Sequence, residues 1–108
     1  MNKYSAVIVS LHSPREKVWG ILMSIESSGV TIHGIDLNSF EDWTREVARG
    51  ESSMALSTVF FPMHRVERIL LDEGMGDIQS MAAVFASRVG EDLWSHLGVP
   101  LPSDDEED

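Results

Sequence analysis

The segment from Lys17 to Leu37 constrains the fold of this chain more than any other stretch. Apolar residues alternate with smaller or more polar ones on both sides of a short polar segment, Glu26-Ser27-Ser28-Gly29. Alternation with period two places each apolar set on one face of an extended strand. Gly29 tolerates the positive φ angles that tight turns use. The segment therefore predicts two strands joined as a β-hairpin.

Two registers are compatible with this hairpin. A four-residue loop pairs Ile25 with Val30. The same register pairs Met23 with Ile32, so that these apolar side chains share one face. A type I turn with a bulge at the glycine would instead pair Glu26 with Val30. The shared apolar face favours the first register.

Two glycines within the hairpin mark candidate positions for strand bending. The apolar alternation changes phase at Gly34, because Ile35 lies on the parity opposite to that of Ile32. Glycine inside a strand often marks a bulge or a tight bend at the corner of a small barrel. We therefore expect the strands to bend or bulge at Gly20 and Gly34.

Three further strands are predicted outside the hairpin. Residues 4–11 are almost continuously apolar, which is typical of a strand buried on both faces. Residues 56–71 form a second β region that Pro62 interrupts, because proline removes a donor from the ladder. The second region is therefore divided into a strand ending near Phe61, a one-turn corner at Met63-His64-Arg65 and a strand from Val66 to Leu71.

Two amphipathic helices are predicted from apolar residues that recur every three or four positions. The first has Ser39 as its expected N-cap and ends at Gly50, with an apolar stripe of Phe40, Trp43 and Val47. The second is expected to run from an N-cap at Asp77 to Gly98, with an apolar stripe of Ile78, Met81, Phe85, Val89, Leu93 and Leu97. Gly90 within it costs about 1 kcal/mol relative to alanine, which indicates close packing or a kink there.

Composition limits the protein class. A chain of 108 residues, 43% hydrophobic and 24% charged, is typical of one globular domain. The absence of cysteine excludes disulfide bonds and thiolate zinc sites. No stretch approaches the length of a membrane span, and the N-terminus lacks a signal-peptide cleavage site. We therefore expect a cytoplasmic protein with no membrane partner.

The charge of the chain is strongly acidic. The formal net charge is −10, which disfavours broad binding to nucleic acid through phosphate neutralisation. Residues 104–108 are all acidic, and the remainder of the chain stays acidic without them. We expect one domain over residues 1–98, followed by a solvated, disordered tail over residues 99–108.

Two short motifs resemble the Sm-like family, which includes the Hfq-type RNA chaperones of bacteria. Val18-x-Gly20-x-Leu22-x-x-x-Glu26 is similar to the first Sm motif, in which a glycine lets a strand bend and an acid precedes the turn. Met63-His64-Arg65-Val66-Glu67-Arg68-Ile69 is similar to the second motif of the Hfq type. The resemblance covers about half of the chain. It implies a mainly β, α+β fold: a small five-stranded SH3-like or Sm-like barrel, here with an inserted short helix and a C-terminal amphipathic helix.

The same resemblance identifies a candidate RNA site. In the family the histidine of the second motif contacts RNA and the neighbouring subunit, so the resemblance implies a site made of His64, Arg65 and Arg68. The chain departs from the family in having Met63 where a basic residue stands before the histidine. The more common role of a corner histidine is to satisfy loop carbonyls with its ring nitrogens. We favour that second interpretation.

No other residues form a recognisable catalytic or metal-binding pattern. His12, His33 and His96 lie on separate predicted elements, so we expect no metal site and no cofactor. Three acids that could be imagined as a catalytic pair are expected to be solvated or to cap helices: Glu16, Asp36 and Asp42. The three tryptophans are expected to be core or interface anchors: Trp19, Trp43 and Trp94.

We therefore expect a non-enzymatic, oligomeric small-barrel protein of an interaction or regulatory type. An Sm-like RNA binder is the alternative, and an enzyme is the weakest hypothesis. Apolar stripes beyond what one small monomer hides indicate an interface. We predict a cyclic homo-oligomer formed by pairing of strand edges, with Phe60, Phe61 and Val66 at the contact. A two-fold dimer is the alternative assembly.

Overall fold

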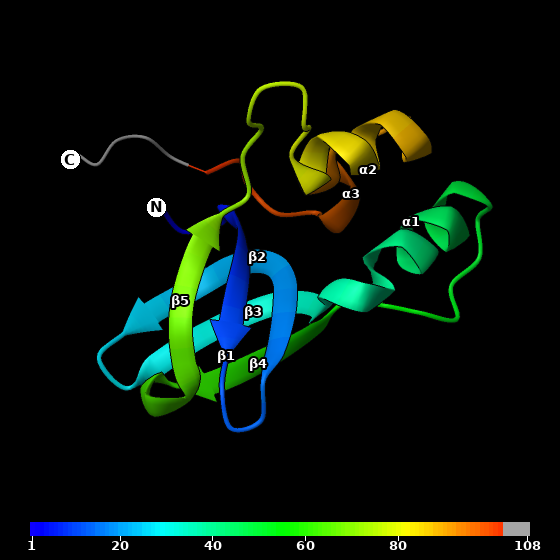
Figure 1. Cartoon of the computed structure of the whole chain (residues 1–108). Helices are drawn as coiled ribbons and strands as arrows, with labels where there is room; N and C mark the ends of the chain where they lie inside the picture. The colour runs from blue at the N-terminus through cyan, green and yellow to red at the C-terminus, as the bar shows by residue number, and fades with distance from the viewer. Residues whose placement is uncertain (103–108) are drawn as a thin grey trace.

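The computed structural model describes residues 1–102 as a curved antiparallel sheet with helices packed against its outer face (Figure 1). The strands are β1 (Ala6–Leu11), β2 (Glu16–Glu26), β3 (Gly29–Asp36), β4 (Ser57–Pro62) and β5 (Val66–Leu71). The helices are α1 (Phe40–Ala48), α2 (Met81–Val89) and α3 (Leu93–Leu97), with short 3-10 helices η1 (Leu37–Ser39) and η2 (Met63–Arg65). The acidic residues 104–108 of the predicted tail lie outside the described residues.

The sheet has the strand order β4-β3-β2-β1-β5, so β4 and β5 form its two edges. The mainly β, α+β prediction is confirmed, and the corner between β4 and β5 lies where it was predicted, at Met63–Arg65. The prediction of a closed barrel is wrong: β4 pairs with β3, β5 pairs with β1, and the sheet stays open. The edge strands approach through inward-facing side chains such as Val59 and Ile69, which pack on the same core rather than forming a ladder.

Each face of the sheet contributes to a separate core, because alternate residues of a strand point to opposite sides. The inner core is formed by strand residues, namely Val7, Val9, Leu11, Val18, Leu22, Val30, Ile32 and Phe61. The outer core joins the sheet to the helices, through Ala6, Trp19, Ile21, Phe40, Trp43, Phe85 and Leu93. The predicted apolar stripe of α1 is confirmed. β1 is buried on both faces, as expected of a strand between β2 and β5.

Aromatic rings connect the sheet to α1 and α2 in the outer core. The ring centroids of Trp19 and Phe40 are 4.8 Å apart in an edge-on arrangement. Trp43 stacks on Phe85 with ring centroids 5.1 Å apart. Offset and edge-on aromatic contacts of this kind stabilise a core beyond the area that they bury. They join the sheet, α1 and α2 in one outer core.

The hairpin register is confirmed at one pair and wrong at the other. Ile25 pairs with Val30, as predicted. Leu22, not Met23, pairs with Ile32, because the register shifts between Leu22 and Ser24. The bulge therefore lies at Met23, and neither Gly20 nor Gly34, where a bulge or a bend was expected, has a register shift. Leu22 faces the inner core and Met23 packs on the outer one, as in a regular strand, and the extra residue shifts the phase of the residues that follow, so that Ser24 pairs with Thr31.

The two strand glycines serve close approach of the backbones. Gly20 and Gly34 pair directly across β2 and β3 without a register shift. A Cβ atom on Gly20 would lie 2.5 Å from the Cα of Gly34 and 2.5 Å from the carbonyl oxygen of His33. No side chain fits between the two backbones. Glycine is therefore required at this pair because the strands approach closely, and not because either strand bulges there.

The C-terminal helix prediction is wrong in its extent. The chain forms two helices, because Gly90 adopts a left-handed φ of 82° and ends α2. The expected kink at Gly90 is thus a complete break. Ser80 rather than Asp77 caps α2, accepting a hydrogen bond from the amide of Ala83 at 3.1 Å. Ile78, predicted to be on the apolar stripe, is 75% exposed in the preceding loop.

The start of the first helix also differs from the prediction. Ser39 forms no side-chain cap. Asp36 instead accepts a hydrogen bond from the amide of Asn38 at 2.8 Å and opens η1, which leads into α1. Gly50 follows α1 with a φ of 75°, as expected of a helix stop. Within residues 1–102, none of the helices has the length and apolar character needed to cross a membrane.

Candidate functional site

The predicted RNA corner contains one arginine with a structural role. Arg65 of η2 donates from Nη2 to the carbonyl oxygen of Pro14 at 2.7 Å and to Oε2 of Glu16 at 2.9 Å. Its Nε donates to the carbonyl oxygen of His12 at 3.2 Å. These bonds fasten the turn between β1 and β2 to the corner before β5. The guanidinium of Arg65 is therefore occupied within the chain.

The other two residues of the predicted corner are solvent-exposed. His64 lies on η2, and its ring forms no hydrogen bond within the described part of the chain. Arg68 lies on β5 opposite Ser10 of β1. The structure thus gives His64, Arg65 and Arg68 different surroundings, and their role in RNA binding stays a prediction.

Arg68 belongs instead to a group of cations around Ser10. A pocket of about 170 Å³ is lined by side chains from the turn after β1 and from β1, β2 and β5, namely Ser10, Leu11, Arg15, Glu16, Lys17, Glu67 and Arg68. Lys17 and Arg68 both pair with Ser10 from the neighbouring strands, so the three side chains share the outer face. The Ser10 hydroxyl is buried and has no hydrogen-bond partner within the described residues. The sequence contained no signal for this group, because the strand register alone brings it together.

The predicted interface residues divide between the core and the surface. Phe60 is 53% exposed on β4, whereas Phe61 is 8% exposed and belongs to the inner core. Val66 is partly buried against the same core. The second edge, β5, exposes two further apolar side chains, Leu70 and Leu71. The accessible apolar surface of the edges is therefore Phe60 on one side and this leucine pair on the other.

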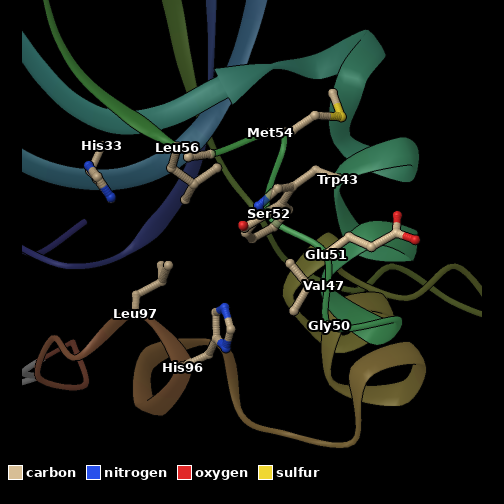
Figure 2. A pocket seen from close by; sticks show the side chains of 11 residues that line it. His33, Trp43, Val47, Gly50, Glu51, Ser52, Met54, Leu56, His96 and Leu97 are labelled. Carbon is tan, nitrogen blue, oxygen red and sulfur yellow. The ribbon is translucent and has the colours of Figure 1, made fainter.

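A cleft of about 430 Å³ opens on the helical side of the sheet (Figure 2). Its walls come from β3, α1, α3 and the loop of residues 49–56. Most of its lining is apolar, with Trp43, Val47, Met54, Leu56 and Leu97, and its polar groups come from His33, Glu51, Ser52 and His96. His33 and His96 lie 63 positions apart in the chain, and no sequence pattern predicts that they share one cavity.

Both histidines of the cleft are held by their Nδ1 atoms. Nδ1 of His33 lies 3.0 Å from the hydroxyl oxygen of Thr58 on β4. Nδ1 of His96 lies 3.0 Å from Oε1 of Glu91, and its ring packs on Phe85 with centroids 5.3 Å apart. Figure 2 shows both rings extending into the same space. Each ring therefore presents its Nε2 atom to the cleft.

The loop that walls the cleft is anchored by Glu46 of α1. Ser53 donates its hydroxyl to Oε2 of Glu46 at 2.6 Å, and the amides of Ser53 and Met54 donate to Oε1 at 3.0 and 3.1 Å. The hydroxyl of Ser53, supported by these amides, holds the pKa of the Glu46 carboxyl below its usual value. The ionised carboxylate thus positions Met54 in the cleft wall.

In comparisons with known proteins, no family model, curated protein or solved structure matched the chain. The resemblance to the Sm-like family therefore rests on its two motifs. The function has to be inferred from the sheet edges, the cation group and the cleft.

Proposed function

We propose that this chain is a non-enzymatic protein of an interaction type that assembles with copies of itself through β4 and β5. The observation that carries the proposal is the character of β4. It is an edge strand of six residues, STVFFP, without a charged side chain, and its Phe60 is 53% exposed. Edge strands present unpaired backbone groups, and soluble proteins usually protect them with charges or cover them. An uncharged edge with an exposed ring is best explained by a partner strand.

The second edge offers a matching surface. β5 exposes Leu70 and Leu71 together with unpaired backbone groups. Pairing β4 of one copy with β5 of the next is a heterologous contact, which closes into a ring when the rotation between copies allows it. Pairing of β4 with a second β4 would give the alternative two-fold dimer. We favour the ring, because it protects both edges of every copy.

The surroundings of the acids support a non-enzymatic role. Glu16 is paired with Arg65 at 2.9 Å, and Asp42 is paired with Arg45 at 3.1 Å. Asp36 caps η1. Each of the three carboxylates that could have served in acid–base chemistry thus has a local structural partner, and none lies in the cleft.

Substitution of the exposed ring on β4 tests the proposal. A lysine at this position places a charge on the edge that a neighbouring strand would have to bury. Phe60→Lys should therefore lower the sedimentation coefficient toward that of a 12.0 kDa monomer. Ile78→Lys introduces the same charge at an apolar residue outside the edge strands and should leave the assembly intact. Equal sedimentation of Phe60→Lys and the unmodified protein would refute edge pairing through β4.

A second candidate function is RNA binding, and the cation group around Ser10 favours it. Arg15, Lys17 and Arg68 have no ion-pair partner within residues 1–102, and they surround the unpaired hydroxyl of Ser10. Phosphate oxygens accept hydrogen bonds from the three cationic side chains. If RNA binds there, Lys17→Ala/Arg68→Ala should weaken retention of a single-stranded RNA and make it less dependent on salt. His64→Ala tests the predicted corner in the same assay, and no retention by the unmodified protein at low salt would exclude this function.

A further inference from the structure

The three tryptophans of the chain differ in how their indole N–H groups are satisfied. Trp19 donates to Oδ2 of Asp72 at 3.2 Å, and Trp94 donates to the carbonyl oxygen of Tyr4 at 2.7 Å. The indole N–H of Trp43 has no hydrogen-bond partner within residues 1–102, although Trp43 is 3% exposed. A donor on a side chain this buried normally finds a partner. Trp43 is therefore the tryptophan whose indole N–H stays available to water or to a ligand.

The unpaired donor of Trp43 belongs to the lining of the cleft. Within the described residues, the Ser10 hydroxyl is the fully buried side-chain polar atom that lacks a partner, so Nε1 of Trp43 keeps some contact with solvent. Figure 2 shows the indole facing the same space as the rings of His33 and His96. Three polar ring groups thus converge on one apolar cavity, which is the usual composition of a small-molecule site.

The hydrogen-bonding character of the cleft follows from its anchored histidines. The carboxylate of Glu91 can accept but not donate, so we assign the proton of neutral His96 to Nδ1, which leaves Nε2 as an acceptor. Nε2 of His33 can take either role, because the hydroxyl of Thr58 can accept or donate. The cleft therefore combines one fixed donor, on Trp43, with one fixed acceptor, on His96.

The charged residues around the cleft give no reason to prefer an anion as the ligand. Glu51 lines the cleft, and Glu91 lies directly behind His96. Among the described residues that line the cleft there is neither lysine nor arginine. Glu51 is paired with Arg49 at 3.1 Å, so its charge is compensated outside the lining. A carboxylate or phosphate in the cleft would still find no lysine or arginine among the lining residues to bond it, whereas a neutral molecule needs none.

From these observations we propose that the cleft binds a small neutral heteroaromatic molecule that carries a carbonyl acceptor next to an N–H donor. The carbonyl accepts the hydrogen bond from Trp43, and the N–H donates to Nε2 of His96. The apolar rings lie against Val47, Leu56 and Leu97. A cavity of about 430 Å³ is large enough for a two-ring compound. The lining residues lie outside β4 and β5, so an experiment can refute the ligand site without refuting the proposed assembly, and the reverse.

The probe for the test is 2-quinolone, a neutral two-ring lactam with adjacent carbonyl and N–H groups. Nuclear magnetic resonance of the full-length, ¹⁵N-labelled protein resolves the three indole N–H signals. Titration with 2-quinolone should shift the signal of Trp43 and leave those of Trp19 and Trp94 in place, because the latter two groups are already paired. A Trp43 signal that stays unchanged at millimolar probe, or equal shifts of all three signals, would overturn the proposal.

Two comparisons test the hydrogen-bond assignment. N-methyl-2-quinolone keeps the shape and the carbonyl but lacks the donor, so it should bind about tenfold more weakly to the unmodified protein. His96→Ala should weaken binding of 2-quinolone by about the same factor, whereas His12→Ala, in the distant turn after β1, should not. Equal affinities for the two probes would refute the acceptor role of His96, even if the His96→Ala variant did not fold.

Discussion

Trp19 and Asp72, which lie 53 positions apart, are joined by a hydrogen bond of 3.2 Å from the indole Nε1 to the carboxylate Oδ2. The same carboxylate accepts hydrogen bonds from the amides of Met81 at 2.7 Å and Ala82 at 2.9 Å. Asp72 therefore connects the centre of the sheet to the first turn of α2. The positive end of the α2 dipole also stabilises a negatively charged carboxylate at this position. Asp72 thus adds hydrogen bonds to the apolar packing of α2 on the sheet.

Asp72→Ala should lower the free energy of unfolding by about 2–3 kcal/mol, because it leaves a buried indole donor and two helix amides without their acceptor. Chemical denaturation measures the change. Glu73→Ala, at an exposed neighbour that forms no hydrogen bond within the described residues, is the matched control. The connection between sheet and helix would be unimportant if both variants lost the same small amount.

Gly20→Ala tests the close approach of β2 and β3. The added Cβ would lie 2.5 Å from the Cα of Gly34 and 2.7 Å from Cγ2 of Ile32, so the strands would have to separate. We expect a loss of about 2 kcal/mol or more, measured by thermal unfolding. At Gly74 the nearest atom to an added Cβ is 3.3 Å away, and Gly74→Ala should cost less than half as much. A Gly20→Ala variant as stable as Gly74→Ala would show that the strands have room to adjust.

Phe85→Ala should cost about 3–5 kcal/mol, because the ring is fully buried and its removal leaves a cavity beneath Trp43. Ile78→Ala provides the contrast, since this residue is 75% exposed and should change stability by less than about 0.5 kcal/mol. Denaturant titration of both variants measures the difference. Similar values for the two would mean that α2 does not pack as described.

Glu46→Gln tests the anchor of the cleft loop through its dependence on pH. The pKa of Glu46 is lowered in the folded state, chiefly by the hydrogen bond from Ser53, so its ionised form stabilises the fold. This contribution is complete above the ordinary value of 4.5 and is lost as the pH falls through the lowered pKa. The stability advantage of the unmodified protein over Glu46→Gln should therefore shrink below pH 4.5. A constant advantage of the unmodified protein at every pH would contradict the assignment.

Local signals in the sequence predicted most of the elements. Pro62 removes a ladder donor at one position, and that local effect located the corner between β4 and β5. Period-two alternation located β2 and β3, but it could not reveal the extra residue at Met23, because a bulge changes the phase without changing the composition. Gly90 predicted a destabilised position in the last helix. The structure shows that its positive φ ends α2 there.

The contacts between distant residues could not be predicted. The role of Asp72 could not be predicted, since nothing near it in the chain shows that Trp19 and the start of α2 supply donors. His33 and His96 were treated as unrelated because they lie on different elements, and the cleft exists because β3 and α3 flank the same loop. Trp43 was expected to be a core or interface anchor, and it lies in the outer core. Its unpaired N–H follows from three-dimensional packing that a periodic pattern does not contain.

Backbone hydrogen exchange across a dilution series tests the proposed assembly most directly. Edge pairing predicts that the outward amides of β4 (Ser57–Pro62) and β5 (Val66–Leu71) are protected at high protein concentration and lose that protection on dilution. The amides of β1 and β2 pair on both sides within one copy and should stay protected throughout. Outward amides on both edges that exchange rapidly at every concentration, from a species that remains a 12.0 kDa monomer, would contradict the account.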